Sequence, residues 1–167
     1  MLDAQHDRTA FACGEEALDR YFPAQATQDM RRHIANCFVA VETATGQVAA
    51  FYTLASASIP TPDLPSELAK RLPRYPVMPA VRVGRLAVDQ RFHGRGLGGA
   101  LLADAARRTL QAPAAAFALL VDAKNDQAVA FYRHHGFHPL VSQPWTLFLP
   151  LATAGKTLLD PGGRADS

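Results

Sequence analysis

A glycine-rich loop constrains this chain more than any other segment does. It runs from Arg91 to Gly99 and reads Arg-Phe-His-Gly-Arg-Gly-Leu-Gly-Gly. An apolar segment typical of a strand, residues 81–88, precedes it, and an amphipathic helical pattern starts at Gly96. Glycines at 94, 96 and 98 permit positive φ and let backbone amides approach a ligand without an intervening Cβ. Because the following helix offers unpaired N–H groups and a positive dipole end, the loop predicts a pyrophosphate site.

Other phosphate-binding loops fit this segment less well. A dinucleotide-binding Gly-x-Gly-x-x-Gly loop has a different spacing and needs an acidic residue about 20 positions later. An ATP-type loop needs Gly-Lys-Ser/Thr, which the segment lacks. A turn that binds nothing is the remaining alternative, and the strand and helix on either side disfavour it.

The composition is that of one ordinary globular domain, with 167 residues of which 49% are hydrophobic and 19% charged. No stretch approaches the roughly 18 to 20 apolar residues of a membrane span. The N-terminus is polar where a secretory signal would be apolar. Cys13 and Cys37 form no CxxC pair and no metal-ligand spacing with histidine. We therefore expect a cytoplasmic protein with two reduced thiols, no bound metal and no membrane partner.

The order of local patterns predicts an α/β (α+β) domain over residues 1–152, with helices on the faces of a mixed sheet. Phe22-Pro23 is expected to separate two N-terminal helices, and Thr45-Gly46 to turn a hairpin. Residues 153–167 are expected to form a disordered tail. The remaining expected elements are a brief helix at 65–71, a strand at 81–88, a helix from 96, a strand at 115–121, a helix from 125 to 136, and closing strands at 137 and 145–151.

Two motifs resemble those of the GNAT acetyltransferases. Arg91-x-x-Gly94-x-Gly96 is similar to that family's coenzyme A pyrophosphate motif, and the run from Asn125 through Tyr132 to Gly136-Phe137 is similar to its second signature. The resemblance implies the GNAT fold, a mixed, mostly antiparallel, twisted sheet flanked by helices, with acetyl-CoA as co-substrate. The cofactor-binding residues it implies are Leu86, Ala87, Val88, Arg91, His93, Gly94, Arg95, Gly96, Leu97, Gly98, Asn125 and Tyr132.

The resemblance makes Tyr132 the catalytic residue, because the matching tyrosine of GNAT enzymes lies near the coenzyme A sulfur. A core aromatic is the alternative. We expect Phe131 to be buried and Tyr132, one helical step of about 100° away, to direct its hydroxyl toward the cleft. A phenol has a pKa of ~10 and a thiol ~8.5, so full proton transfer to a departing thiolate is uphill by about 2 kcal/mol. Tyr132 is therefore expected to stabilise the thiolate by donating a hydrogen bond. Asn125 is expected both to cap its helix and to face the cofactor.

Many GNAT enzymes place a glutamate base on the strand before the loop, but residues 81–88 carry arginines and no carboxylate. An α-amino group of pKa ~8 is partly neutral at pH 7 unaided, so the site suits a weakly basic amine beside a polyanion. Segments 10–21, 51–55, 84–89 and 131–137 also resemble the GNAT toxins of bacterial type II toxin–antitoxin systems, and the likeness runs from about residue 7 to 151. It implies acetylation of aminoacyl-tRNA and a ribbon-helix-helix antitoxin as partner. A homodimer is the expected oligomeric state.

The net charge of +2 is small, so an RNA-binding surface must be local. Arg82 and Arg85 are an odd step apart, and only one can face the acceptor on a regular strand. We favour Arg85. The residues predicted to bind tRNA are Arg31, Arg32, Arg71, Arg74 and Arg85. Two alternatives stay open: a GNAT enzyme that acts on a small amine or a protein N-terminus, and a catalytically silent acetyl-CoA-binding regulator.

Overall fold

The chain divides into two compact units in the computed structural model, which describes residues 1–159. The first unit comprises Met1–Ala55 and Val83–Leu102. The second comprises Ser56–Arg82 and the chain from Ala103 onward. The chain passes between the units within β2, β3 and α4, so each unit contains part of these three elements.

The strands hydrogen-bond in the order β1-β2-β3-β4-β6-β5. The pairs β1–β2, β4–β6 and β5–β6 are antiparallel. Neighbouring strands β3 and β4 are connected by α4, the kind of connection that parallel pairs use. The predicted α/β class with a mixed sheet is confirmed. The strands are β1 (Asn36–Val41), β2 (Val48–Pro60), β3 (Val77–Val88), β4 (Ala118–Asp122), β5 (His138–Pro139) and β6 (Thr146–Pro150), and α4 spans Leu97–Gln111.

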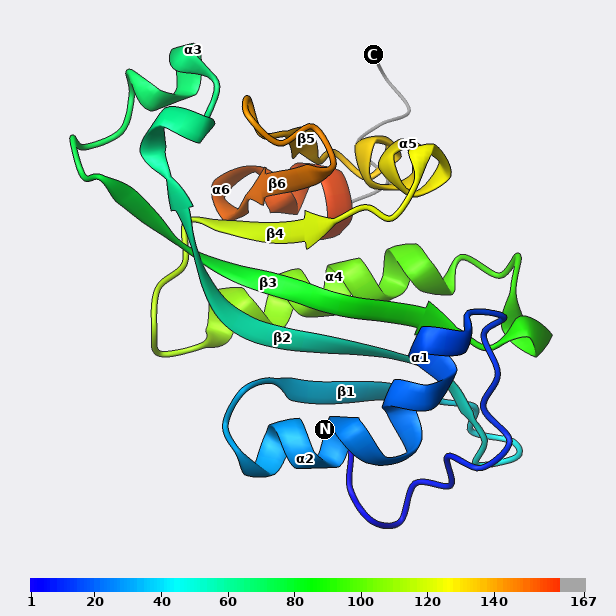
Figure 1. The fold of residues 1–167 in the computed structure, drawn as a ribbon. Coiled ribbons are helices and arrows are strands. Elements are labelled where there is room, and N and C mark those ends of the chain that lie inside the picture. Colours follow the sequence, from blue (N-terminus) through cyan, green and yellow to red (C-terminus); the bar gives the residue numbers. More distant parts are fainter. Residues whose placement is uncertain (160–167) are drawn as a thin grey trace. The chain divides into compact units, whose positions relative to one another are not determined.

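A nearly continuous helical segment packs beside β1 in the first unit (Figure 1, blue). It consists of α1 (Glu16–Arg20), a π-helical turn (Tyr21–Gln25) and α2 (Ala26–Arg31). The expected separation at Phe22-Pro23 is wrong. Proline has no amide hydrogen for the helical ladder, and the wider π-helical turn accommodates that gap without ending the helix.

Aromatic side chains from this helical segment form the core of the first unit with β2. Phe22 lies parallel to Phe51 with 4.3 Å between ring centroids, and Phe11 meets both rings edge-on at 4.9 and 5.4 Å. Cys37 lies in the same cluster, where burial raises the pKa of its thiol to about 12. Each buried aromatic ring contributes about 2 to 3 kcal/mol, so this face holds the helices on the sheet.

The predicted hairpin is confirmed, and its second strand is longer than expected. Cys37 pairs with Thr53 and Ala40 with Ala50. Gly46 turns the chain with φ +72°, a conformation that favours glycine. The apolar run that predicts this strand covers residues 48–54, but β2 continues to Pro60.

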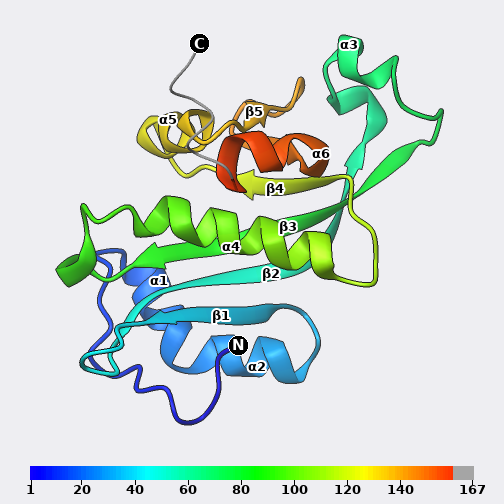
Figure 2. The same cartoon turned by 180° about the vertical axis from the view of Figure 1, so that it is seen from behind.

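The second unit buries a separate core under β4 and β6, where Leu120 and Phe148 are almost inaccessible. Figure 2 shows α6 (red) on the side of this unit that faces the viewer, and residues of α6 and β6 are in contact. The helices of this unit are α3 (Ser66–Ala69), α5 (Asp126–His134), α6 (Leu151–Ala154) and the larger part of α4.

The disordered tail expected from residue 153 is wrong over its first seven positions. The chain is helical through α6 and a following π-helical turn, Gly155–Leu159. Leu151, Ala154 and Leu158 are buried at helical spacing, and this apolar stripe holds the segment on the fold. Residues 160–167 of the expected tail lie outside the described residues. Within residues 1–159, no helix is both long and apolar enough to cross a membrane.

We expect Leu158→Ala to lower the free energy of unfolding by about 2 to 3 kcal/mol, because it removes a buried side chain and leaves a cavity. Urea unfolding followed by far-ultraviolet circular dichroism measures the change. Lys156→Ala, at an exposed position of the same turn, is the control and should change it by less than about 0.5 kcal/mol. Equal, small effects at both positions would show that the segment contributes nothing to stability.

Candidate active site

A buried carboxylate fixes the start of the glycine-rich loop. Asp89 follows β3, is 1% exposed, and accepts a hydrogen bond from the Ala12 amide at 3.0 Å. Its other contacts come from Arg91, whose backbone N–H and Nε each donate at 2.9 Å. Burial alone would raise the pKa of Asp89, but these hydrogen bonds and the charge of Arg91 outweigh it and lower the pKa to about 2. The carboxylate therefore stays ionised and ties the N-terminal segment to the loop.

The sequence predicts positive φ at three glycines of the loop, and the structure shows it at two of them. Gly94 and Gly96 adopt φ of +77° and +76°, and a Cβ built on either would meet no atom within 4 Å. Gly98 does not have the positive φ for which the sequence analysis selected it, because it already lies in the first turn of α4. The first amide of this helix with an acceptor is that of Ala100, which binds the Gly96 carbonyl at 3.2 Å. The amides before it have no intrahelical acceptor and are free for a ligand.

The loop's charged side chains are held by neighbouring carboxylates. Arg91 bridges Asp89 and Gln47, to which its Nη1 donates at 3.0 Å. Arg95 is exposed and lies 3.9 Å from Glu42 in an ion pair. The His93 ring reaches back to the Val88 carbonyl, with Nε2 2.7 Å from the oxygen. The backbone carbonyl of Val88, one of the residues predicted to bind the cofactor, therefore already has a partner.

The strand before the loop buries Ala87 in the core of the first unit and leaves Leu86 and Val88 half-buried. Because successive residues of a strand face opposite sides, Leu86 and Val88 share the face that Ala87 does not use. The cofactor contacts predicted for these three residues stay a prediction.

A tight helix end positions Tyr132 in the second unit. Asn125 caps α5 by accepting the Ala128 amide at 2.8 Å, which confirms the predicted cap. At the other end Gly136 has φ +95° and its amide binds the Arg133 carbonyl, while the Phe137 amide binds the Tyr132 carbonyl at 3.1 Å. These two bonds form a Schellman motif. The rings of Tyr132 and Phe137 meet edge-on at 5.6 Å, as is usual for such a helix end.

The burial of the two aromatics on α5 is the reverse of what the sequence analysis expected. Tyr132 is 9% exposed, whereas Phe131 is only partly buried against Tyr132 and His135. The Schellman motif causes this, since it folds Phe137 under Tyr132 and leaves Phe131 on the side of the helix. Burial, and then the negative charge of Asp122, raises the pKa of Tyr132 to about 12. The phenol therefore stays protonated at neutral pH and keeps its hydrogen for donation.

The two arginines of β3 have different partners. Arg82 donates to Asp122 of β4 in the second unit, and Asp122 also accepts from Thr146 at 2.9 Å. Arg85 lies in the first unit with its guanidinium carbon 3.8 Å from the centroid of the Tyr21 ring. β3 buries Met78 and Ala80 in one part and Val83 and Ala87 in the other, so odd and even positions exchange roles along it. Counting along a regular strand therefore could not assign the faces, but the contacts do.

A family model described as an acetyltransferase (GNAT) domain matches residues 33–139. The chain belongs to the GNAT acetyltransferase family. It is 39% identical over 156 residues to a tRNA-acetylating toxin of Mycobacterium tuberculosis, covering 92% of each protein. It is also similar to a solved structure of the toxin AtaT complexed with acetyl-methionyl-tRNAfMet, with a TM-score of 0.82, 33% identity and 94% of each chain covered. A tyrosine-to-phenylalanine mutant of AtaT, bound to acetyl-CoA and to the C-terminus of the antitoxin AtaR, is similar with a TM-score of 0.76, 28% identity, and 92% and 91% of the two chains covered.

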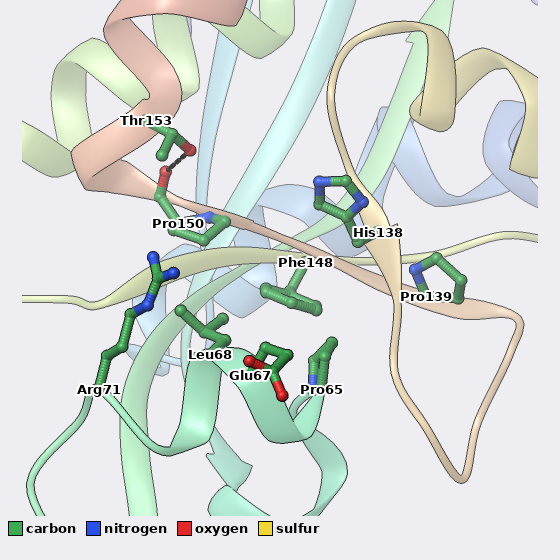
Figure 3. Close-up of a pocket in the computed structure, with 9 residues that line it drawn as sticks. All are labelled: Pro65, Glu67, Leu68, Arg71, His138, Pro139, Phe148, Pro150 and Thr153. Carbon is green, nitrogen blue, oxygen red and sulfur yellow. Dashed lines mark hydrogen bonds between the residues drawn. The ribbon is translucent and has the colours of Figure 1, made fainter.

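The arginines predicted to bind tRNA are distributed over both units of this GNAT chain. Arg31 and Arg32 are exposed at the end of α2 in the first unit. Arg74 is exposed in the loop before β3. Arg71 lines a pocket of about 550 Å³ in the second unit, and Figure 3 shows it on the side opposite His138, with the Phe148 ring between them.

The sequence analysis missed a cluster beneath Arg85. Tyr21 donates its hydroxyl to Asp29 at 2.8 Å, and Gln25 donates to the other oxygen of that carboxylate at 2.9 Å. Asp29 is 7% exposed. The only available signal was an acidic residue on the apolar face of a helix, eight positions after a tyrosine. No group of three or more metal-ligating side chains occurs in the described part of the chain, and the expectation of a metal-free enzyme stays a prediction.

The lowered pKa of Asp89 makes an acid-stability prediction for this GNAT domain. The folded pKa of about 2 lies below the ordinary value of 3.8. The group therefore contributes stability above pH 4 that is lost as pH falls toward 2, about 2 to 3 kcal/mol in all. Asp89→Asn should remove this part of the pH dependence, measured by urea unfolding at pH 6 and pH 3. Glu67→Gln, which changes an exposed carboxylate, should leave the dependence unchanged, and a wild-type slope in Asp89→Asn would contradict the assignment.

Proposed function

We propose that this GNAT enzyme transfers an acetyl group from acetyl-CoA to the α-amino group of aminoacyl-tRNA and acts as the toxin of a type II toxin–antitoxin pair. The observation that carries the proposal is the match to a tRNA-acetylating toxin over 92% of each protein, together with the likeness to AtaT complexed with acetyl-methionyl-tRNAfMet. Both likenesses span the loop and Tyr132, so they include the residues on which the chemistry depends.

The loop suits the pyrophosphate of acetyl-CoA. The space above Gly94 and Gly96 is open, and the free amides at the start of α4 provide donors at the positive end of the helix. Arg91 and Arg95 add positive charge, partly neutralised by their carboxylate partners. Leu86, Ala87 and Val88 would meet the pantetheine arm through their backbone, with His93 moving off the Val88 carbonyl. His93, Leu97 and Gly98 complete the loop contacts, and Asn125 faces the cofactor while it caps α5.

Tyr132 acts as a hydrogen-bond donor to the departing sulfur. Bound acetyl-CoA supplies the acetyl thioester, and the amine nitrogen attacks its carbonyl carbon as the carbon–sulfur bond breaks. A pKa of about 12 for the phenol, against ~8.5 for a thiol, makes full proton transfer uphill by about 5 kcal/mol. This exceeds the value that ordinary pKa values give, so burial strengthens the case for donation without transfer. The thiolate is then quenched by the proton that the amine nitrogen loses when it forms the amide, so Tyr132 keeps its own proton.

The acceptor amine needs no protein base. β3 contains no carboxylate, and its two arginines would disfavour an ammonium ion nearby. An α-amino group of pKa ~8 supplies a useful neutral fraction at pH 7, whereas a lysine-like amine of pKa ~10.4 would supply less than about one part in a thousand. Arg31, Arg32, Arg71, Arg74 and Arg85 would meet the tRNA phosphates.

The partners follow from the same assignment. AtaT in its mutant form binds the C-terminus of the antitoxin AtaR. We infer that a ribbon-helix-helix antitoxin neutralises this chain in the same way, that the toxin acts as a homodimer, and that it works in the cytoplasm, where its tRNA substrate is. Residues 1–152 would form one catalytic domain, extended by the helical segment to Leu159.

Tyr132→Phe should keep the ring contacts and remove the donor. We expect the single-turnover rate to fall about 100- to 1000-fold, the usual cost of one well-placed donor, with acetyl-CoA affinity nearly unchanged. Rapid-quench acetylation of aminoacyl-tRNA and calorimetric titration with acetyl-CoA measure the two effects. Tyr75→Phe removes an exposed hydroxyl and is the control. A fall of less than about threefold in Tyr132→Phe would leave this residue a packing role only.

Arg31→Ala with Arg32→Ala should weaken tRNA binding and flatten its dependence on salt. Each lost phosphate contact lowers the slope of log K against log salt by about 0.7 to 0.9. The matched control is Arg107→Ala with Arg108→Ala, which removes two arginines paired with Asp104 on α4. If the wild-type protein acetylates small amines at rates unaffected by salt and leaves aminoacyl-tRNA unmodified, it is a small-amine GNAT enzyme instead.

A further inference from the structure

The guanidinium of Arg85 lies over the aromatic ring of Tyr21. Its central carbon is 3.8 Å from the Tyr21 ring centroid, well inside the range of a cation–π contact. Among residues 1–159 it makes no ion pair and donates no side-chain hydrogen bond. Arg82, Arg91 and Arg95 each pair with a carboxylate. Arg85 thus differs from its neighbours in being fixed by stacking and not by an acid.

The ring beneath Arg85 is itself held from below. Tyr21 is 7% exposed and donates its hydroxyl to Asp29 at 2.8 Å, and Gln25 occupies the second carboxylate oxygen. Burial would raise the pKa of Asp29, but the bonds from Gln25 and Tyr21 and the charges of Arg85 and Arg32 lower it instead. The carboxylate stays ionised under the ring, where its charge also favours the cation above.

The backbone of Arg85 is anchored as well. Its amide donates to the Thr53 hydroxyl at 3.1 Å, and Thr53 is almost fully buried. A Cβ on the preceding Gly84 would lie 3.1 Å from that hydroxyl, so the glycine makes room for the contact. Main chain and side chain of Arg85 are therefore both restrained, which lowers the entropy lost when it binds a ligand.

We propose that Tyr21 and Asp29 are positioning residues that hold the Arg85 guanidinium ready for a phosphodiester of the aminoacyl-tRNA acceptor end. This inference rests on the proposed function. A planar fork of N–H donors matches the oxygens of a phosphate, and no side-chain acceptor of residues 1–159 occupies the fork of Arg85. A buried carboxylate such as Asp29 adds little net stability to a fold, because removing its charge from water is costly. A role in orienting its neighbours accounts better for its presence.

Kinetics of substituted full-length protein test the proposal. Tyr21→Leu removes the ring and should raise KM for aminoacyl-tRNA about 10-fold, with kcat and the KM for acetyl-CoA within about twofold. Tyr21→Phe keeps the ring but loses the bond to Asp29, so it should raise the KM for aminoacyl-tRNA about threefold, between the values of the wild type and Tyr21→Leu. The salt slope of KM should fall by about 0.7 to 0.9 in Tyr21→Leu, as for one lost phosphate contact. Phe11→Leu, which removes a ring from the same core but has no arginine above it, should lower Tm and leave these values unchanged.

A double-mutant cycle separates positioning from packing. In an Arg85→Gln background, Tyr21→Leu should have no further effect on KM, because the group it positions is gone. Arg85→Lys keeps the charge but replaces the planar guanidinium over the Tyr21 ring, and it should also raise KM several-fold. Because position 85 is only half-buried, this variant should still fold. Additive effects in the cycle, or Tyr21→Leu behaving like Phe11→Leu, would overturn the inference. A raised KM for acetyl-CoA would assign Arg85 to the cofactor instead. Wild-type protein that acetylates no aminoacyl-tRNA overturns the proposed function, and this inference with it.

Discussion

The hydrogen bonds of Asp89 fix the glycine-rich loop within the first unit. This buried carboxylate joins an N-terminal amide, the end of β3 and the Arg91 side chain, and so fixes where the glycine-rich loop leaves the sheet. The loop's two left-handed glycines and the free amides of α4 can face one ligand only because their starting point is fixed. Arg91 has two roles here, because the charge that would attract a pyrophosphate also keeps the Asp89 carboxylate ionised.

The candidate catalytic residue, Tyr132, depends on burial and not on an anchoring ion pair. Tyr132 is made a donor by exclusion from water and by the nearby charge of Asp122, both of which oppose loss of its proton. Arg82 and Thr146 in turn occupy Asp122. The second unit thus holds a neutral phenol and, near it, a carboxylate that two other side chains contact. The first unit presents cations and free amides.

Local patterns predicted much of this molecule from sequence. The positive φ of Gly94 and Gly96, the Asn125 cap and the hairpin each depend on residues a few positions apart, and each is confirmed. What sequence reasoning missed depends on distant partners. Asp89 binds an amide 77 positions away, and Arg85 stacks on Tyr21 from another element. Because of the turn that follows α5, Tyr132 is buried and Phe131 is not, and helical periodicity alone does not predict the effect of that turn. The helical end at 151–159 was missed because its apolar stripe is short and lies before a run of glycine and proline.

The Schellman motif at the end of α5 has a consequence for how this segment can vary in length. An α-helix rotates by about 100° per residue, so the interval between Tyr132 and the stop at Gly136 sets the direction in which the phenol points. An insertion of one residue there would leave a good helix and turn the hydroxyl away from its present surroundings. The position where the helix ends is also fixed, because only glycine fits at 136: a Cβ there would come within 2.9 Å of Thr157. The number of residues in this turn is therefore more tightly constrained than most of the side chains it carries.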